Sequence, residues 1–239
     1  MRFGRMSGVK KRNPEDAQGE IWQSTMLDMD SRLRVARGMG NDETLASIQV
    51  FSTLKRRGHP DGPPPTLSDG WGGIDDAMLE VYGIVPGYSG RGRPPTRKQP
   101  QAGWQYLQMV KVRDEHGKLE GIHLRAIYGK KAELITLMGK STAYVEHSNL
   151  TARIFNSRLV RKTLAFSKDL AMHKAAACWQ DCFYNWVRPH KSLRLPATQP
   201  GKQRWTKQTP GMAAHLTDHI WTVKELLTLI PLSSLKHAS

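Results

Sequence analysis

Asp69 is the first residue whose type and position suggest chemistry. It follows the short extended segment Thr66-Leu67-Ser68 and precedes a glycine-rich stretch, residues 70–73. A carboxylate at the end of a core strand, beside glycines that let another backbone approach, is well placed to bind a metal ion. Because Asp-Gly is also a frequent turn pair, a purely structural turn is the competing interpretation.

Glu146 is the second such residue. On a helix, Glu146, Asn149 and Arg153 recur at i, i+3 and i+7 and share one face. A carboxylate, an amide and a guanidinium on one face suit a metal ion next to a phosphate, whereas the alternative is a solvated polar face. A few carboxylates can hold the Mg²⁺ ions of phosphoryl transfer, so Asp69 and Glu146 together suggest that chemistry.

The charge balance favours a polyanionic partner. The 239 residues include 36 Lys and Arg against 21 Asp and Glu, a net charge of +15. Basic residues cluster without any acidic residue in 1–13, 87–100 and 186–207. Nucleic acid is favoured over an anionic membrane because no basic amphipathic helix stands out. The sequence also has neither a long apolar run typical of a transmembrane helix nor the apolar stretch of a secretory signal.

The patterning predicts a mixed α/β fold that could position the two carboxylates. Alternating and turn-bounded segments predict strands, and apolar residues at helical spacing predict helices. The expected strands are 21–27, 33–39, 65–68, 106–113 and 120–128. The expected helices are 41–57 (capped by Asn41), 75–81, 142–166, 167–187 and, after the capping box of Thr222 and Glu225, a short one ending at Ile230.

Other residues of potential function have plainer interpretations. Cys178 and Cys182 lie four positions apart on an expected helix, and two thiols without further ligands favour small buried residues over a zinc site. Trp179 is expected to pack in the core. His190 lies among basic residues, which makes a phosphate contact its best functional interpretation, although most isolated histidines are structural.

Four segments carry a resemblance to a known family: SDGWGG (68–73), VEHSNLTAR (145–153), RKTLAFSK (161–168) and YNWVRPH (184–190). Over nearly its whole length the chain resembles the DDE transposases of the insertion-sequence-one group and their relatives. The resemblance implies a ribonuclease H-like fold, in which a mixed sheet is flanked by helices and a β-hairpin is inserted between the second and third acidic residues. It assigns those two catalytic, metal-binding roles to Asp69 and Glu146, with Mg²⁺ or Mn²⁺ as cofactor.

The resemblance also implies a domain organisation and a partner. Residues 1–195 would form the catalytic domain, with a basic insertion at about 87–128, and residues 196–239 a C-terminal extension with a short helix. The partner would be the DNA of element ends and targets, bound by a homo-oligomer in the cytoplasm, on the nucleoid of a prokaryotic host. The expected DNA-contacting residues are Arg91, Arg93, Asn149, Arg153, Arg161, Lys162, Lys168, Arg188, His190 and Lys191.

One part of the family pattern is missing. In the family the first catalytic Asp lies on the first strand, ahead of the hairpin. That strand would here lie at or before residues 2–9, and no acidic residue precedes Glu15. We therefore expect a truncated chain with impaired catalysis. Asp28 and Asp30, in the hairpin turn, are the only substitutes to consider for the first acid.

Three functions follow as hypotheses. The first is a transposase catalytic domain that cleaves DNA and joins its 3′ end to a target. The second is a non-catalytic DNA-binding remnant that regulates a full-length transposase through mixed oligomers. The third, a ribonuclease H-like structure-specific nuclease, lacks support from the C-terminal motifs. An Asp-bearing strand encoded in frame upstream of Met1 would favour the first hypothesis over the second.

Overall fold

The computed structural model describes residues 21–88, 90, 92–139, 143–159, 167, 169–197 and 204–228. These residues form two compact units. The first comprises the described residues up to Met26 and from Val35 to 167, and the second comprises Leu27–Arg34 together with the described residues from Asp169 onward. The expected domain boundary at residue 195 stays a prediction.

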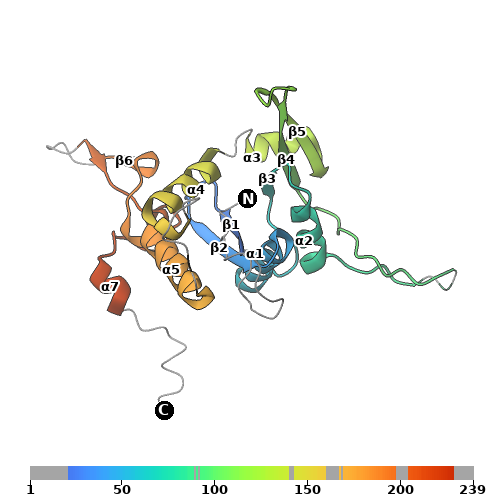
Figure 1. Ribbon diagram of the computed structural model, residues 1–239, viewed down its shortest axis with the longest axis horizontal. Helices are drawn as coiled ribbons and strands as arrows, with labels where there is room; N and C mark the ends of the chain where they lie inside the picture. The colour runs from blue at the N-terminus through green and yellow to red at the C-terminus, as the bar shows by residue number, and fades with distance from the viewer. Residues whose placement is uncertain are drawn as a thin grey trace, which may run out of the picture. The chain divides into compact units, whose positions relative to one another are not determined.

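The first unit is a mixed α/β structure (Figure 1). In chain order its elements are β1 (Trp22–Leu27), β2 (Arg34–Gly40), α1 (Glu43–Arg57), β3 (Thr66–Asp69), α2 (Gly73–Tyr82), β4 (Tyr106–Arg113), β5 (Leu119–Tyr128), α3 (Lys131–Met138), α4 (Ala143–Phe155) and the 3-10 helix η1 (Ser157–Leu159). The end residues Leu27 and Arg34 of the β1–β2 hairpin belong to the second unit.

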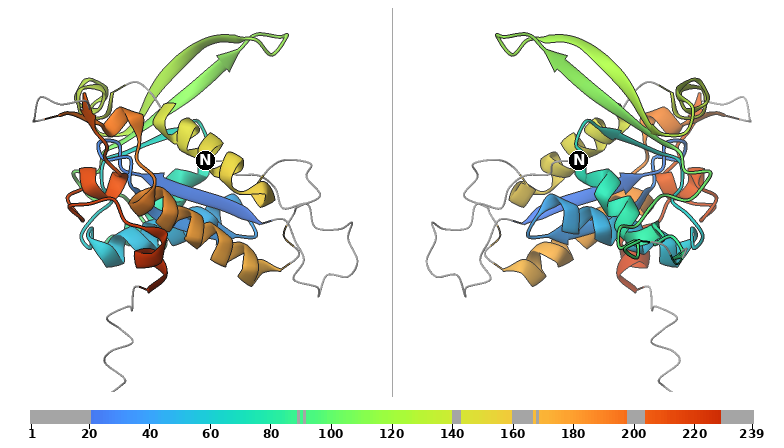
Figure 2. Two further views of the ribbon diagram at one scale, coloured as in Figure 1. Left: turned by 90° about the vertical axis from the view of Figure 1, so that its left-hand side faces the viewer. Right: turned by 90° about the vertical axis from the view of Figure 1, so that its right-hand side faces the viewer.

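The sheet that carries Asp69 has the strand order β3-β4-β5. β3 pairs with β4 in parallel and β4 with β5 in antiparallel fashion, so the sheet is mixed, as expected. Tyr106 and Leu107 at the base of β4 are fully buried, and only the outer part of the β4–β5 hairpin projects from the unit (Figure 2). The base of the expected insertion is therefore part of the core sheet.

Helices α1 and α2 cover the core of this unit. α1 begins after Asp42, whose side chain accepts a hydrogen bond of 2.7 Å from the Leu45 backbone N–H, so the expected cap Asn41 is wrong by one residue. Residues of α1, α2 and β4 share one hydrophobic cluster. The rings of Phe51, Tyr82 and Trp104 meet edge to face within it, at 6.5 Å between consecutive centroids. These two helices pack against the base of the sheet whose strand β3 ends at Asp69.

The first of the two long helices expected from the sequence is shorter than predicted. α4 ends at Phe155 rather than Phe166, because Asn156 turns its side chain to the backbone, accepting a hydrogen bond of 3.1 Å from the Arg158 N–H. Residues 160–166 lie outside the described part of the chain. α3, which the sequence analysis did not predict, buries Leu134 and Met138.

The second unit is built around a helix that changes its winding. In chain order its elements are α5 (Leu170–Cys182), the π-helical turn η2 (Phe183–Val187), the 3-10 helix η3 (Lys191–Leu193), β6 (Leu195–Pro196), β7 (Trp205–Thr206), α6 (Pro210–Ala213) and α7 (Val223–Thr228). α5 begins at Leu170, three residues after the expected start at Ser167, and Asp169 is its N-cap. The capping box at α7 is confirmed: Thr222 and Glu225 each bond the other's backbone N–H, at 2.6 and 3.1 Å.

Two expectations for α5 are wrong. Cys178 is exposed rather than buried, and Trp179 is 41% exposed rather than a core residue. The buried face of α5 instead carries His173, Ala177 and Gln180. The large apolar ring of Trp179 therefore does not determine which face of the helix is buried. Within the described residues no helix is long and apolar enough to cross a bilayer.

Candidate functional site

Asp69 is the last residue of β3, and its side chain is exposed. It is paired with Met109 of β4 in the parallel register. Directly after it, the backbone passes close to the neighbouring strand, because a Cβ on Gly70 would lie 3.1 Å from a Val110 methyl group. The expected close backbone approach is therefore seen at Gly70, whereas a Cβ on Gly72 would meet nothing within 4 Å and one on Gly73 would meet the Trp71 ring.

A buried polar network holds the end of β3 in place. The Tyr106 hydroxyl lies 2.8 Å from the Ser68 hydroxyl and accepts a hydrogen bond of 2.8 Å from the Gln108 amide. The same amide nitrogen donates to the Trp71 carbonyl at 3.2 Å. Burial raises the pKa of Tyr106 to about 12, so its hydroxyl stays neutral at pH 7. These hydrogen bonds connect β4 to the end of β3 and to the turn that follows Asp69.

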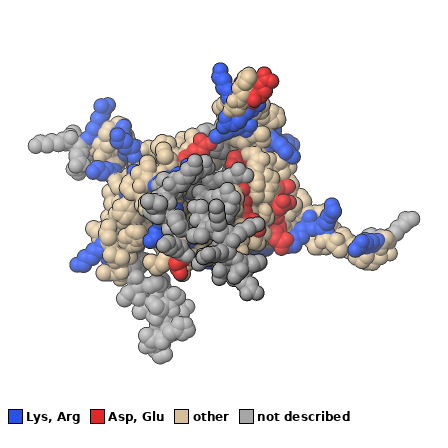
Figure 3. All heavy atoms as spheres, viewed as in Figure 1, with Lys and Arg blue, Asp and Glu red and all other residues tan. Residues whose placement is uncertain are grey.

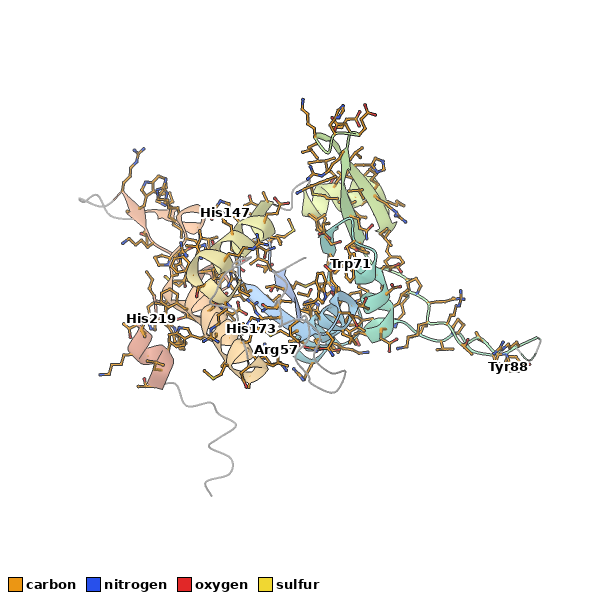
Figure 4. The ribbon with its side chains drawn as sticks, viewed as in Figure 1. Arg57, Trp71, Tyr88, His147, His173 and His219 are labelled. Atoms are coloured by element: carbon orange, nitrogen blue, oxygen red, sulfur yellow. The ribbon has the colours of Figure 1, made fainter. Side chains whose placement is uncertain are left out.

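Trp71 closes the glycine-rich turn from the other side. Its ring lies so close to Gly73 that a Cβ there would come within 2.1 Å of a ring carbon. Gly73 is the first residue of α2, and Figure 4 shows Trp71 near the end of that helix. Any side chain at Gly73 would displace the ring, so this glycine is required by packing.

Glu146 reaches the sheet through Lys111. The Lys111 ammonium donates a hydrogen bond of 2.6 Å to the Glu146 carboxylate. Lys111 lies two residues beyond Met109 on β4, and residues two apart on a strand point to the same face of the sheet. Met109 is the partner of Asp69, and laterally paired residues also share a face. The register therefore brings Glu146 to the sheet face that carries Asp69.

The electrostatics of this pair are those of an accessible site. The side chains of Lys111 and Glu146 are 42% and 56% exposed, and an ion pair so exposed contributes only about 0–1 kcal/mol. Lys111 can therefore exchange Glu146 for another partner at little cost. Among the described residues, no group of three or more His, Cys, Asp or Glu side chains is arranged to hold a metal ion.

Asp75, in the first turn of α2, is a nearby acid that the sequence analysis did not consider. The Tyr128 hydroxyl donates a hydrogen bond to its carboxylate. Burial, followed by the effect of Asp75, raises the pKa of Tyr128 well above its ordinary value. Asp75 thus helps to keep Tyr128 protonated, and it ties α2 to β5.

The other residues of the expected α4 face are more enclosed than Glu146. Asn149 and Arg153 are half-buried. The Asn149 Oδ1 and the Arg153 Nε are buried, and neither has a hydrogen-bond partner within the described part of the chain. Glu146, by contrast, is exposed, so the three residues share a helix face without sharing an environment. Their expected DNA contacts stay predictions.

The possible substitutes for a first acid are residues of the β1–β2 turn. Asp28 accepts hydrogen bonds from the backbone N–H, at 2.9 Å, and the hydroxyl of Ser31, which is the work of a turn residue. Asp30 is exposed in the same turn. Both belong to the second unit, whereas Asp69 and Glu146 belong to the first.

The expected DNA-contacting residues have different environments. Arg93 and Lys191 are exposed. His190 is half-buried, its ring packs edge to face on Tyr184 with centroids 4.5 Å apart, and its Nε2 is buried. Burial, and then Arg188 and Arg34, lower the pKa of His190 to about 4, so the imidazole is neutral at pH 7. Arg91, Arg161, Lys162 and Lys168 lie outside the described residues.

The arm formed by residues 84–99 is a further exposed basic segment of the first unit. An isolated bridge between Ile84 and Gln99 closes its base. Tyr88 lies near the outer end of the arm (Figure 4), and the Tyr88 hydroxyl donates a hydrogen bond of 3.0 Å to the Gly92 carbonyl. Arg93 and Arg97 are exposed along it. The described residues of the basic segment 87–100 are thus mostly exposed, and they contain no regular helix or strand.

Lys111 is a residue of the candidate site that the sequence analysis did not name. Its link to Glu146 spans 35 positions and depends on the strand register, so no local spacing signals it. The weaker signal that could have found it is the alternation of Met109 and Lys111 toward one face of a predicted strand. Comparison with protein-family models, with curated proteins and with solved structures gave no match for this chain.

Proposed function

We propose that the chain is the catalytic-domain portion of a DDE-type DNA transposase with a ribonuclease H-like fold. The observation that carries the proposal is the register that brings Glu146 to the sheet face of Asp69. The mixed sheet, with an acid at the end of a parallel strand and a second acid on a later helix, supports it. So does the excess of basic residues, since its substrate is the DNA of element ends and targets.

Asp69 and Glu146 are the residues that would hold Mg²⁺ or Mn²⁺. The donor set fits such an ion in kind, because both groups are exposed carboxylates and Mg²⁺ prefers oxygen ligands while keeping several waters. When bound, the ion would activate the attacking oxygen and stabilise the leaving one. Lys111 pairs with the Glu146 carboxylate at the sheet face, and its ammonium would be available to neutralise a phosphate there.

A second function, a DNA-binding regulator without catalysis, is favoured by one observation. Lys111 already neutralises Glu146 at 2.6 Å. A site of two carboxylates, one of them paired with a lysine, has low negative charge with which to attract a dication. In this alternative the chain binds DNA and forms mixed oligomers with an active transposase.

Metal binding and DNA cleavage distinguish the two functions. Mn²⁺ binding would be followed by electron paramagnetic resonance, and cleavage by incubating duplexes of the element-end sequence with Mg²⁺ or Mn²⁺. We expect Asp69→Asn and Glu146→Gln each to abolish Mn²⁺ binding and to lower cleavage by at least ~100-fold, the usual cost of misplacing reacting groups. Glu133→Gln, which removes an exposed α3 carboxylate paired with Lys130 at 3.2 Å, is the matched control and should change neither.

The outcomes separate cleanly. DNA binding by the unchanged chain without any Mn²⁺ binding would support the regulator and reject the transposase. Cleavage that survives Asp69→Asn and Glu146→Gln would show that the site assignment is wrong.

A further inference from the structure

A short ribbon in the second unit gathers basic residues around one tryptophan. We call Lys191, Arg194, Arg204, Trp205 and Lys207 the ribbon cluster. β6 pairs with β7 in antiparallel fashion, with Pro196 opposite Trp205. The base of the ribbon is closed by a hydrogen bond of 2.8 Å from the His190 N–H to the Gln208 carbonyl, and a further bond of 3.2 Å joins Ala197 to Arg204. The backbone that carries the cluster is therefore fixed on both sides.

Two guanidinium groups lie on the ring of Trp205. The Arg194 guanidinium carbon is 4.2 Å from a ring centroid and that of Arg204 is 5.8 Å away. Cation–π attraction at these distances holds a flat guanidinium in a defined orientation while leaving N–H groups at its edge available for another acceptor. Trp205 is 37% exposed, so the ring supports these cations at the surface rather than in the core.

The positive charge of the cluster is not neutralised locally. Residues 186–207 contain no Asp or Glu. Lys191, Arg194, Arg204 and Lys207 are all exposed, and none forms a salt bridge with a described residue. Figure 3 shows Lys and Arg side chains gathered over the β6 region. Surface cations that are oriented but unpaired raise the local potential and attract an anionic partner.

We propose that the ribbon cluster is a binding site for the phosphate backbone of duplex DNA, and that it acts without the carboxylate pair Asp69 and Glu146. Arginine binds phosphate oxygens through two parallel N–H groups, and a preoriented guanidinium loses less entropy on binding. Contacts to phosphates fix the position of a protein on DNA without reading its sequence. The site thus adds to the proposed cleavage function a separate means of holding DNA.

The chemistry of the cluster favours a duplex backbone over two other anionic partners. Stacking of single-stranded bases needs an open aromatic face, whereas the Trp205 ring carries the guanidinium of Arg194. Insertion into an anionic membrane needs an apolar surface next to the cations. Leu195 is the only exposed large aliphatic residue of the described ribbon, which is too little apolar area for that mode.

The test measures DNA binding by fluorescence anisotropy over a series of salt concentrations. The probe is a 20-base-pair duplex of arbitrary sequence, in EDTA so that metal-dependent cleavage does not enter. We expect the double variant Arg194→Gln/Arg204→Gln to weaken binding at least tenfold at moderate salt. The slope of log K against log salt should fall by about 2, since each phosphate contact contributes about 0.9. Lys191→Gln/Lys207→Gln, which leaves the Trp205 ring covered, should have a similar effect on the slope.

The control removes the same charge elsewhere. Arg56→Gln/Arg57→Gln neutralises two exposed arginines at the end of α1 and should leave the slope unchanged. An equal fall in that control would show that affinity merely follows net charge, and the proposal would be rejected. Trp205→Phe retains an aromatic support and should keep most of the affinity, whereas Trp205→Ala should lose several-fold.

Two further results would overturn the proposal. One is binding of a single-stranded 20-mer that is tighter than duplex binding and is lost in Trp205→Ala. The other is a loss of binding to phosphatidylglycerol vesicles in the arginine variant while duplex binding is unchanged. Because the assay contains no divalent metal, its result is independent of whether Asp69 and Glu146 support cleavage.

Discussion

Two ion pairs of similar length have opposite surroundings in this molecule. Lys111 and Glu146 in the first unit lie 2.6 Å apart, with side chains 42% and 56% exposed. Arg34 and Asp181 in the second unit lie 3.0 Å apart, with side chains only 2% and 17% exposed. The separation of the charges is therefore a poor guide to what each pair does, and burial is a better one.

The Arg34 pair is part of a structural hub. The Arg34 guanidinium lies 3.9 Å from the centre of the Tyr184 ring, and the side chain of Asn185 bonds both the N–H and the carbonyl of Arg34 at 3.0 Å. The Lys111 pair has no such enclosure. A buried charge depends on its partner, whereas an exposed one exchanges its partner with solvent, an ion or a phosphate. The comparison therefore indicates that the Arg34–Asp181 pair stabilises the fold, whereas the Lys111–Glu146 pair is available to bind another partner.

Loss of the buried partner should have the largest effect. Asp181→Ala leaves the Arg34 charge enclosed without its carboxylate, and breaking a buried pair in this way costs about 3–5 kcal/mol. Urea denaturation should show a correspondingly lower free energy of unfolding. Glu80→Ala, which breaks the exposed Lys98–Glu80 pair at 2.8 Å, is the control and should cost less than about 1 kcal/mol. An equal loss of unfolding free energy in the two variants would show that burial does not distinguish the two ion pairs.

The same hub should make stability depend on pH through His190. Its pKa in the folded chain is lowered to about 4 from an ordinary value of 6.5, because the ring is buried and faces Arg188, Arg34 and Arg32. The unfolded chain therefore takes up the proton first, so this contribution is complete above about pH 6.5 and is lost as the pH falls toward 4. Allowing for partial exposure, the loss should be on the order of 1–2 kcal/mol.

Denaturation at pH 7 and pH 5 checks this expectation. His190→Phe should flatten the difference between the two pH values, whereas His116→Gln, at an exposed turn, should leave it unchanged. An undiminished pH dependence in His190→Phe would assign the effect to other groups.

Loss of the exposed partner should have the smallest effect on stability and a different effect on binding. Lys111→Gln should change the free energy of unfolding by less than about 1 kcal/mol. It should also tighten Mn²⁺ binding, because the cation that competes for Glu146 is gone. Thermal denaturation and Mn²⁺ titration of the same variant measure both quantities. A large destabilisation, or weaker metal binding, would show that Lys111 is structural.

The elements that position the site were largely predictable from sequence. The β1–β2 hairpin, α1, β3, β4 and β5 follow from local alternation, turn residues and caps, all of which act over a few positions. α3 was missed because its eight residues bury only Leu134 and Met138. Trp179 was misplaced because burial on α5 follows tertiary packing rather than hydrophobicity alone.

The site was less predictable than the elements that carry it. Asp69 could be placed at a strand end from its neighbours, and Glu146 on a helix. Their common sheet face could not, because it depends on the register Asp69↔Met109 and on a lysine 35 positions before Glu146. Register is a property of paired strands, and a single sequence does not contain it. The environment of His190 likewise depends on Arg32 and Arg34, far away in the chain.

The Asn185 bridge has a consequence for the order in which the chain can fold during synthesis. Its hydrogen bonds join residues 151 positions apart. The turn Leu27–Arg34 leaves the ribosome before α5 and η2 do, but it completes its unit only after both have been translated. At roughly 5–20 residues per second, the turn waits on the order of ten seconds or more for those partners. During that interval the Arg34 guanidinium is still hydrated, and the second unit begins to form only after η2 has been translated.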